Sequence, residues 1–312
     1  MRRPVKRAAS RARLSRPAEF ETVIDFVRHA ATQFSASRLA FGQGTDDAVG
    51  DAVLLVCSAL SLAPQDFDAF ANARLGAQEK RKIFDLIEAR VHTRKPVPYL
   101  INRVYMRGVP FYVDERVIIP RSFLGEIIEG DLFGGEEFSL VAPDAVERVL
   151  DLCTGSGCLA ILAAMRFPNA QVDAVDVSAE ALAVAKLNVA EHGLEDRVAL
   201  HRGDLFAPLG KTSYDLILTN PPYVDAAGMK ALPPEYRHEP KRALDGGTDG
   251  IDIVRRIVDE AGAHLTAQGG LLCEIGRGRA VVEEAYPDKS FLWIDTASSS
   301  GEVFWLGADQ LV

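Results

Sequence analysis

The chain has 312 residues, of which 48% are hydrophobic and 25% are charged, and its formal net charge is −9. This length favours two domains with a proper buried core, and no apolar stretch approaches the ~20 residues that a membrane-spanning helix requires. The composition therefore excludes a transmembrane protein, and the acidic balance argues against the broad basic face of a nucleic-acid-binding protein.

The chain begins with a basic tail, residues 1–18, in which seven Lys and Arg residues precede the first acidic residue, Glu19. Without these seven positive charges, the net charge of −9 would be −16. The Arg, Ala, Ser and Pro content of the tail predicts a disordered segment that contacts RNA phosphates weakly at most. The tail lacks the apolar core of a secretory signal, although a eukaryotic transit peptide has a similar composition.

The four cysteines form no CxxC pair and have no metal-ligand spacing with the six histidines. We therefore predict no metal site. Because the sequence carries no recognisable secretory signal, we expect a reducing, cytoplasmic location in which the cysteines remain thiols.

Residues 19–98 have the periodicity of helices and predict a small helical domain. Thr45 is the expected N-cap of its second helix, and Pro64 suits the first turn of the segment that follows. The apolar stripes of the first two helices lie within 23–34 and 53–60, and two further helices are expected at 67–75 and 77–91.

Residues 99–121 change to short β-rich runs punctuated by glycine and proline. This pattern predicts a β-hairpin that links two domains. After Arg121 we expect a short helix that ends at Glu129 and then an acidic, glycine-rich loop.

Residues 122–312 alternate between strands and helices, which predicts a doubly wound α/β domain with a mostly parallel sheet of seven strands. The last two strands have no helix between them, so we expect a C-terminal antiparallel hairpin, which is typical of the methyltransferase variant of this fold. Helices are expected from 157, at 179–191 and at 251–264, and strands at 149–150, 171–175, 198–201, 215–219, 270–275, 291–295 and 302–306.

A glycine-rich loop follows the first strand of this domain and is the expected cofactor site. Glycines let the backbone turn tightly against a ligand, and the next helix offers free N–H groups. With Ala160 and Asp176 the loop also satisfies the dinucleotide-binding pattern, so it does not by itself separate NAD from S-adenosyl-L-methionine. The loop residues expected to contact the cofactor are Thr154, Gly155, Ser156 and Gly157.

Acidic residues near the ends of the first three strands favour S-adenosylmethionine. Asp151 could receive the amino group of a methionine moiety, and Asp204, beside the apolar Leu205, could accept from an adenine amino group. Asp176 suits ribose hydroxyls under either interpretation. As alternatives, Asp176 or Ser178 could cap the next helix, and Asp204 could simply end a strand. Ligands of open α/β sheets bind along this edge, which favours the cofactor role.

The motif Asn220-Pro221-Pro222-Tyr223 follows the fourth strand. Asn220 Oδ1 and the Pro221 carbonyl could accept both N–H bonds of a planar amide or amino group, on which Tyr223 would stack. We expect catalysis by such positioning without a general base, and we interpret His238 as a loop residue. Asn-Pro can also mark an ordinary turn. A dehydrogenase has no use for this motif.

From about Tyr99 to the C-terminus, the chain resembles the protein glutamine N5-methyltransferases. The resemblance implies that Gly155, Gly157, Asp176, Asp204 and Asn220 contact S-adenosylmethionine, that residues 220–223 hold the glutamine side chain, and that the N-terminal helices dock a protein substrate. The residues that carry it lie at 111–122, 151–157, 220–225, 232–240 and 246–252.

The family has two branches, one acting on the Gly-Gly-Gln loop of peptide-chain release factors and one on the third protein of the large ribosomal subunit. Residues 111–122 and 235–240 look like the ribosomal-protein branch. We therefore expect the substrate to be a glutamine of the large-subunit ribosomal protein, and release factors are the alternative. Two stretches depart from the usual pattern of that branch, 123–125 and 274–278, and they concern the surroundings of the cofactor pocket.

Two other functions use similar residues. Enzymes that methylate base amino groups in rRNA or DNA hold the same kind of planar nitrogen, usually on a flipped base. The net charge of −9 and the absence of a recognisable basic, aromatic-rich target domain argue against them. A cofactor-sensing binding module would need a degraded acceptor motif, whereas residues 220–223 are intact.

Overall fold

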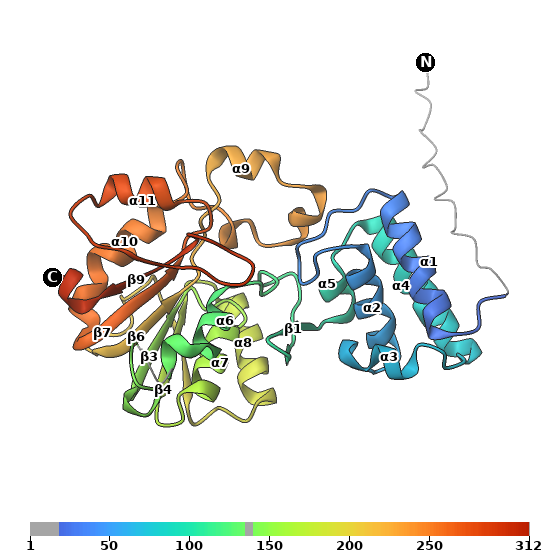
Figure 1. Cartoon of the computed structure of the whole chain (residues 1–312), viewed down its shortest axis with the longest axis horizontal. Helices are drawn as coiled ribbons and strands as arrows, with labels where there is room; N and C mark the ends of the chain where they lie inside the picture. Colours follow the sequence, from blue (N-terminus) through green and yellow to red (C-terminus); the bar gives the residue numbers. More distant parts are fainter. Residues whose placement is uncertain (1–18, 135–139, 312) are drawn as a thin grey trace, which may run out of the picture. The chain divides into compact units, whose positions relative to one another are not determined.

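The computed structural model describes residues 19–134 and 140–311. The expectations for the basic tail lie outside these ranges. The chain divides into two compact units, 1–101 and 102–312, whose elements are labelled in Figure 1. Within the described part of the chain, no single helix is both long and apolar enough to cross a membrane, although one sharply bent pair of short helices, Ala48–Ala59 with Pro64–Phe70, passes when taken together.

The first unit consists of helices around a small aromatic and aliphatic core. Phe26, Phe34, Leu55, Ile83 and Ile87 are fully buried in it. The helices are α1 (Val23–Ala36), α2 (Ala48–Ala59), η1 (Pro64–Asp66), α3 (Phe67–Phe70), α4 (Ala77–Thr93) and α5 (Val97–Ile101).

Two local expectations for this unit are wrong. The helix expected at 67–75 ends at Phe70, because the backbone of 71–75 instead pairs with the start of α1: Ile24 N donates to Ala71 O at 2.9 Å, which satisfies a free N–H of α1. The N-cap of α2 is Asp47 and not Thr45, since the Asp47 side chain accepts from two backbone N–H groups of the first turn. Pro64 begins η1 as expected.

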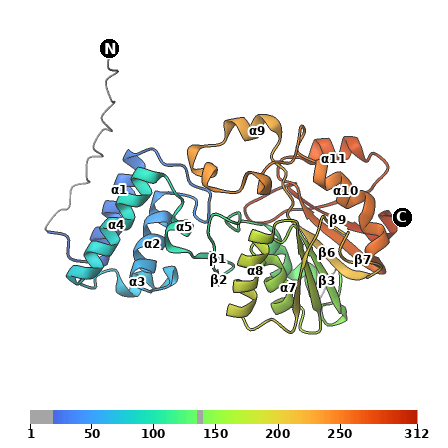
Figure 2. The ribbon, with the colours of Figure 1, turned by 180° about the vertical axis from the view of Figure 1, so that it is seen from behind.

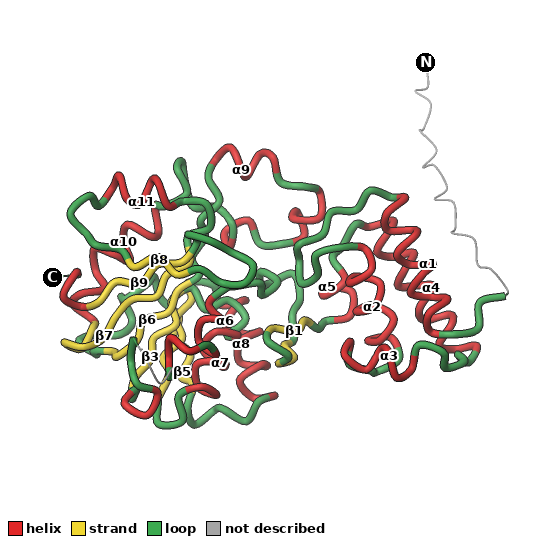
Figure 3. Tube along the Cα trace, in the orientation of Figure 1, coloured by secondary structure: helices red, strands yellow, loops and turns green. Residues whose placement is uncertain are grey.

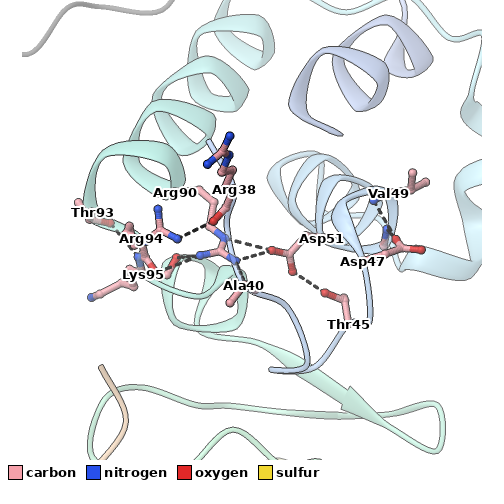
Figure 4. Close-up of polar contacts among 11 residues, drawn as sticks. Arg38, Ala40, Thr45, Asp47, Val49, Asp51, Arg90, Thr93, Arg94 and Lys95 are labelled. Carbon is pink, nitrogen blue, oxygen red and sulfur yellow. Dashed lines mark hydrogen bonds and ion pairs between the residues drawn. The ribbon is translucent and has the colours of Figure 1, made fainter. Parts of the chain in front are cut away.

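A buried arginine joins three parts of this unit (Figure 4). Arg90 on α4 is 1% exposed, and its guanidinium donates to the Asp51 carboxylate on α2 at 3.0 Å. It also donates to Ala40 O and Arg94 O, each at 3.0 Å. Thr45 donates to the other oxygen of Asp51 at 2.5 Å. Burial raises the pKa of Asp51 in spite of the neighbouring guanidinium.

The second unit begins with the expected antiparallel hairpin, β1 (Val104–Met106) and β2 (Val109–Phe111). Residues 117–119, which are all β-branched and belong to the same β-rich stretch, do not form a strand. Helix α6 (Leu124–Glu129) follows as expected.

The main sheet of this unit has seven strands in the order β5-β4-β3-β6-β7-β9-β8. The first five in that order are parallel, and β9 lies antiparallel to both of its neighbours, β7 and β8. This confirms the fold class. The strands are β3 (Arg148–Leu152), β4 (Gln171–Asp176), β5 (Val198–Arg202), β6 (Tyr214–Thr219), β7 (Leu265–Glu274), β8 (Leu292–Ile294) and β9 (Val303–Gly307).

Helices cover both faces of the sheet (Figures 1 and 2), and long loops gather at one of its edges (Figure 3). On one face, buried residues of β3, β6 and β7 form a core with Ile257 of α10 (Asp252–Ala261) and Val282 of α11 (Arg279–Ala285). Helix α6 covers the other face together with α7 (Cys158–Arg166) and α8 (Ala179–Glu191), as Figure 1 shows. Helix α9 spans Ala226–Ala231.

Candidate active site

The residues singled out in the sequence follow neighbouring parallel strands. Leu152 at the end of β3 pairs with Val175 of β4 on one side and with Thr219 of β6 on the other. The glycine loop, Asp176 and Asn220 therefore meet at the carboxyl edge of the sheet, where ligands of such sheets bind.

The glycine loop is shaped by two glycines with left-handed backbones and by Asp176. Gly155 and Gly157 have φ of +57° and +81°, and a Cβ on Gly157 would lie 3.2 Å from Ala185 Cβ of α8. The loop and α8 could not keep this spacing with a larger residue there. Asp176 accepts from Gly155 N at 2.9 Å, so it holds the loop. The cap of α8 is Ser178, which accepts from Ala181 N.

Asp151 is a fully buried carboxylate beneath this loop. Its Oδ2 accepts from Thr154 Oγ1 at 2.5 Å and from Ala160 N at 3.1 Å. Its Oδ1 has no hydrogen-bond partner in residues 19–134 and 140–311, and the same is true of the buried Ser156 Oγ. Burial raises the pKa of Asp151 to about 7. An unpaired buried acceptor is costly, so these atoms fit the cationic amino group of a methionine moiety.

At the expected adenine site, Asp204 makes an ion pair that the sequence did not predict. Leu205 is buried, with 6% of its surface exposed, and its φ is +49°. The exposed side chain of Asp204 accepts from both terminal nitrogens of Arg256 on α10, at 3.1 and 2.9 Å. An adenine amino group would therefore share this carboxylate with Arg256, a residue that the sequence did not single out.

The side chain of Asn220 is half-buried, and it makes no hydrogen bond to any residue in the described ranges. Pro221 is buried and Pro222 half-buried. Neither proline can donate an N–H, so the backbone of residues 221 and 222 offers only carbonyl acceptors. The amide of Asn220 is thus available for a ligand at the carboxyl edge of the sheet.

The acceptor motif rests on a second glycine-rich loop. Val224 N donates to Leu244 O at 2.8 Å, and Gly246 N donates back to Val224 O at 2.9 Å. Gly250 approaches so closely that a Cβ there would lie 2.7 Å from Tyr223 O. This contact gives residues 246–252, which carry part of the family resemblance, a structural reason for their glycines.

Tyr223 is anchored by a buried carboxylate. Its hydroxyl donates to Glu274 Oε1 at 2.9 Å, and its ring lies against Gly276, where a Cβ would stand 2.7 Å from the ring. The other oxygen of Glu274 accepts from Ser122 Oγ at 2.6 Å and Phe123 N at 2.9 Å. Burial raises the pKa of Glu274 to about 7. Sequence reasoning treated Glu274 only as a departure from the usual family pattern.

The two stretches compared with the ribosomal-protein branch contact one another through a second buried carboxylate. Arg121 donates to both oxygens of Glu239, at 2.7 and 2.9 Å, and Ile119 N donates to the same group at 3.0 Å. The Glu239 side chain is fully buried, and the Arg121 guanidinium lies over the Tyr236 ring. The sequence alone does not show that the Glu239 side chain is buried, so it gave no reason to single this residue out.

A doubly wound unit with a glycine loop after its first strand and Asn-Pro-Pro-Tyr after its fourth defines an S-adenosylmethionine-dependent methyltransferase. The family model of the methyltransferase small domain matches residues 138–233. The chain is 62% identical over 295 residues to the ribosomal protein uL3 glutamine methyltransferase of Bradyrhizobium diazoefficiens, covering 94% of this chain and 92% of that one. The chain belongs to the ribosomal protein uL3 glutamine methyltransferase family.

Other relatives carry the same name. The protein from Burkholderia pseudomallei is 50% identical over 95% of this chain and 97% of its own length, and that from Bordetella pertussis is 49% identical over 94% and 97%. Among solved structures, the hMettl16 catalytic domain in complex with MAT2A 3'UTR hairpin 6 is 16% identical, covering 81% of this chain and 91% of that one, with a TM-score of 0.49. The relatives decide the choice that the glycine loop left open, in favour of S-adenosylmethionine.

Proposed function

We propose that this enzyme transfers a methyl group from S-adenosylmethionine to the side-chain N5 of a glutamine in ribosomal protein uL3. The observation that carries the proposal is the uncommitted amide of Asn220, which stands at the same sheet edge as the glycine loop. The names of relatives at 62% and 50% identity support uL3 as the substrate.

The reaction would depend on positioning, because the lone pair of a carboxamide nitrogen is delocalised into its carbonyl. Asn220 Oδ1 and the Pro221 carbonyl would accept the two N–H bonds of the glutamine, with Pro222 and Tyr223 completing the site. A bond from nitrogen to the methyl carbon forms as the carbon–sulfur bond breaks, and the cationic nitrogen then loses a proton to water. Orientation of this kind can supply several of the ~7–11 kcal/mol available from fixing reactants in place.

The cofactor would lie along the loop Thr154 to Gly157. Asp151 Oδ1 is the proposed acceptor for its ammonium, supported by the unpaired buried oxygen. Asp176 would face the ribose, and Asp204 with Leu205 would face the adenine.

The helical segment 19–98 is the proposed docking domain for uL3, and the basic tail 1–18 would add a weak contact with RNA if methylation accompanies ribosome assembly. The substrate is a ribosomal protein, so we place the reaction in the cytoplasm. We propose 99–121 as the linker and 122–312 as the catalytic domain.

The test is to incubate the enzyme with labelled S-adenosylmethionine and, separately, with uL3, release factors and rRNA. We expect label in uL3 alone, as a mass increase of one methyl group on one glutamine. A uL3 variant with this glutamine changed to alanine should remain unlabelled. Label confined to release factors would support the alternative branch, and label in rRNA would contradict glutamine methylation altogether.

A further inference from the structure

A network of two buried carboxylates surrounds the acceptor motif, and nothing in the proposed chemistry uses it. Glu274 contacts Tyr223, Ser122 and Phe123, whereas Glu239 contacts Arg121 and Ile119. Both carboxylates therefore hold the same short segment, residues 119–123, but only Glu274 touches the acceptor motif.

The contacts of Glu274 come from two segments that lie far from it in the sequence. Ser122 and Tyr223 lie 152 and 51 residues away, respectively. Glu274 is fully buried at the end of β7. Burying a carboxylate is costly unless its hydrogen bonds are made, and here three donors converge on its two oxygens. A residue whose only role was to end strand β7 would not need to be a buried carboxylate.

Tyr223 has little freedom once these contacts are made. Its backbone is fixed by Gly246 and Gly250, its ring by Gly276, and its hydroxyl by Glu274. Without the last contact the ring could still lie on Gly276, but the half-buried hydroxyl would lose its acceptor. The hydroxyl of Tyr223 consequently has one acceptor, and this acceptor is also the anchor of residues 122–123.

We propose that Glu274 is a positioning residue for methyl transfer, which fixes the Tyr223 side chain and thereby the acceptor site between Asn220 and Tyr223. This inference rests on the proposed methylation by the Asn-Pro-Pro-Tyr motif. Glu274 itself touches neither reactant. It acts through the Tyr223 hydroxyl, and its bonds to Ser122 and Phe123 keep it aligned.

The ionisation state of Glu274 matters for this role. Burial raises its pKa to about 7, and the groups that face it are Tyr223, Glu302 before β9 and Cys273 on its own strand, with Arg121 close to Tyr223. Ionised Glu274 accepts from all three donors. The protonated acid carries a donor of its own, so one of these hydrogen bonds is lost below pH 7.

The experiment is a double-mutant cycle on kcat with uL3 as acceptor. Tyr223→Phe removes only the hydroxyl, and Glu274→Gln removes the charge and one of the acceptor positions. We expect each single change to lower kcat by roughly 10-fold to 100-fold, as for a hydrogen bond to a charged group. The double variant should be no slower than the slower single variant. S-adenosylhomocysteine affinity should change by less than about threefold, because the cofactor loop is untouched.

Glu239→Gln is the matched control, since it removes another buried carboxylate that holds residues 119–121. Its effect on kcat should add to that of Tyr223→Phe, and it should retain the fall in kcat below pH 7, which Glu274→Gln should lack. The proposal would be overturned if the effects of Tyr223→Phe and Glu274→Gln on kcat were additive. It would also be overturned if Tyr223→Phe were coupled equally strongly to Glu239→Gln and to Glu274→Gln.

Two further outcomes are distinguishable. If Glu274→Gln does not fold, Tyr223→Phe alone decides, because it leaves the carboxylate in place: an unchanged kcat refutes the positioning role. If the wild-type enzyme does not label uL3, the proposed substrate is wrong, and the same cycle is measured with whichever protein or RNA the wild type labels.

Discussion

Gly246 lies against the backbone of Tyr223, so that a Cβ on Gly246 would stand 2.7 Å from Tyr223 Cα. It would also lie 2.5 Å from Gly250 O. All these neighbours are backbone atoms, which cannot rotate away as the end of a side chain can. The acceptor motif and the glycine-rich loop 246–250 can therefore keep their present spacing only if residue 246 has no side chain.

Gly246→Ala should displace the acceptor motif by several tenths of an ångström and lower kcat by roughly 10-fold to 100-fold, because misplacement near 1 Å can cost about that much. Cofactor affinity should change far less. Steady-state kinetics and calorimetric titration with S-adenosylhomocysteine measure the two effects. Gly76→Ala is the control, since the nearest atom to its Cβ is the flexible end of Glu79 at 3.4 Å. A normal kcat for Gly246→Ala would show that the loop does not constrain the motif.

Asn220→Ala should reduce turnover far more than cofactor affinity. Its amide makes no hydrogen bond within the described residues, so the substitution removes a ligand contact without leaving a protein group unpaired. We expect kcat to fall by at least about 100-fold, in keeping with the loss of several kcal/mol of orientation. Single-turnover rates and binding of S-adenosylhomocysteine separate the two quantities. Equal losses in both would contradict the role assigned to Asn220.

Local patterns were sufficient to predict most of the elements of the second unit. Helix α8 begins and ends where expected, at Ala179 and Glu191, because Ser178 caps it and its apolar spacing is helical. The glycine loop and the terminal hairpin were likewise expected from short stretches. In contrast, α3 ends early because residues 71–75 pair with a segment about 50 residues away in sequence, and no local signal predicts such pairing.

The candidate site was predictable in its motifs but not in its buried charges. Asn220 and Gly155 could be placed at one sheet edge from the order of strands alone. The partners of Glu274 and Asp204 could not, since Ser122 lies 152 residues from Glu274 and Arg256 lies 52 from Asp204. Such contacts depend on how segments far apart in the sequence pack together, and local sequence patterns give no distance between such segments.

Arg90→Met should destabilise the first unit by about 3–5 kcal/mol, because it leaves Asp51 as an unpaired buried charge. The double variant Arg90→Met with Asp51→Leu should recover part of this loss. Both tryptophans, Trp293 and Trp305, lie in the second unit. Urea unfolding followed by far-UV circular dichroism therefore reports both units, and tryptophan fluorescence reports the second. An unfolding midpoint that does not change for Arg90→Met would contradict a structural role for the pair.

Cofactor affinity should rise as the pH rises towards about 7 and then level off, because Asp151 ionises over this range and its unpaired Oδ1 then attracts the cofactor ammonium. The sign follows from the direction of the shift: burial raises the pKa of this acid to about 7, so below that pH the folded protein holds a neutral carboxyl that binding must deprotonate. The measurement is the dissociation constant of S-adenosylhomocysteine between pH 5.5 and about 8.5, with proton release followed in two buffers.

Asp151→Asn provides the matched control, since it keeps the size and one acceptor oxygen but cannot ionise. Its affinity should be weaker at pH 8 and nearly independent of pH between about 6 and 8, which are the pH values that bracket the raised pKa. Retention of the wild-type pH dependence in this variant would assign the titration to another group, with Asp176 the next candidate because burial also raises its pKa.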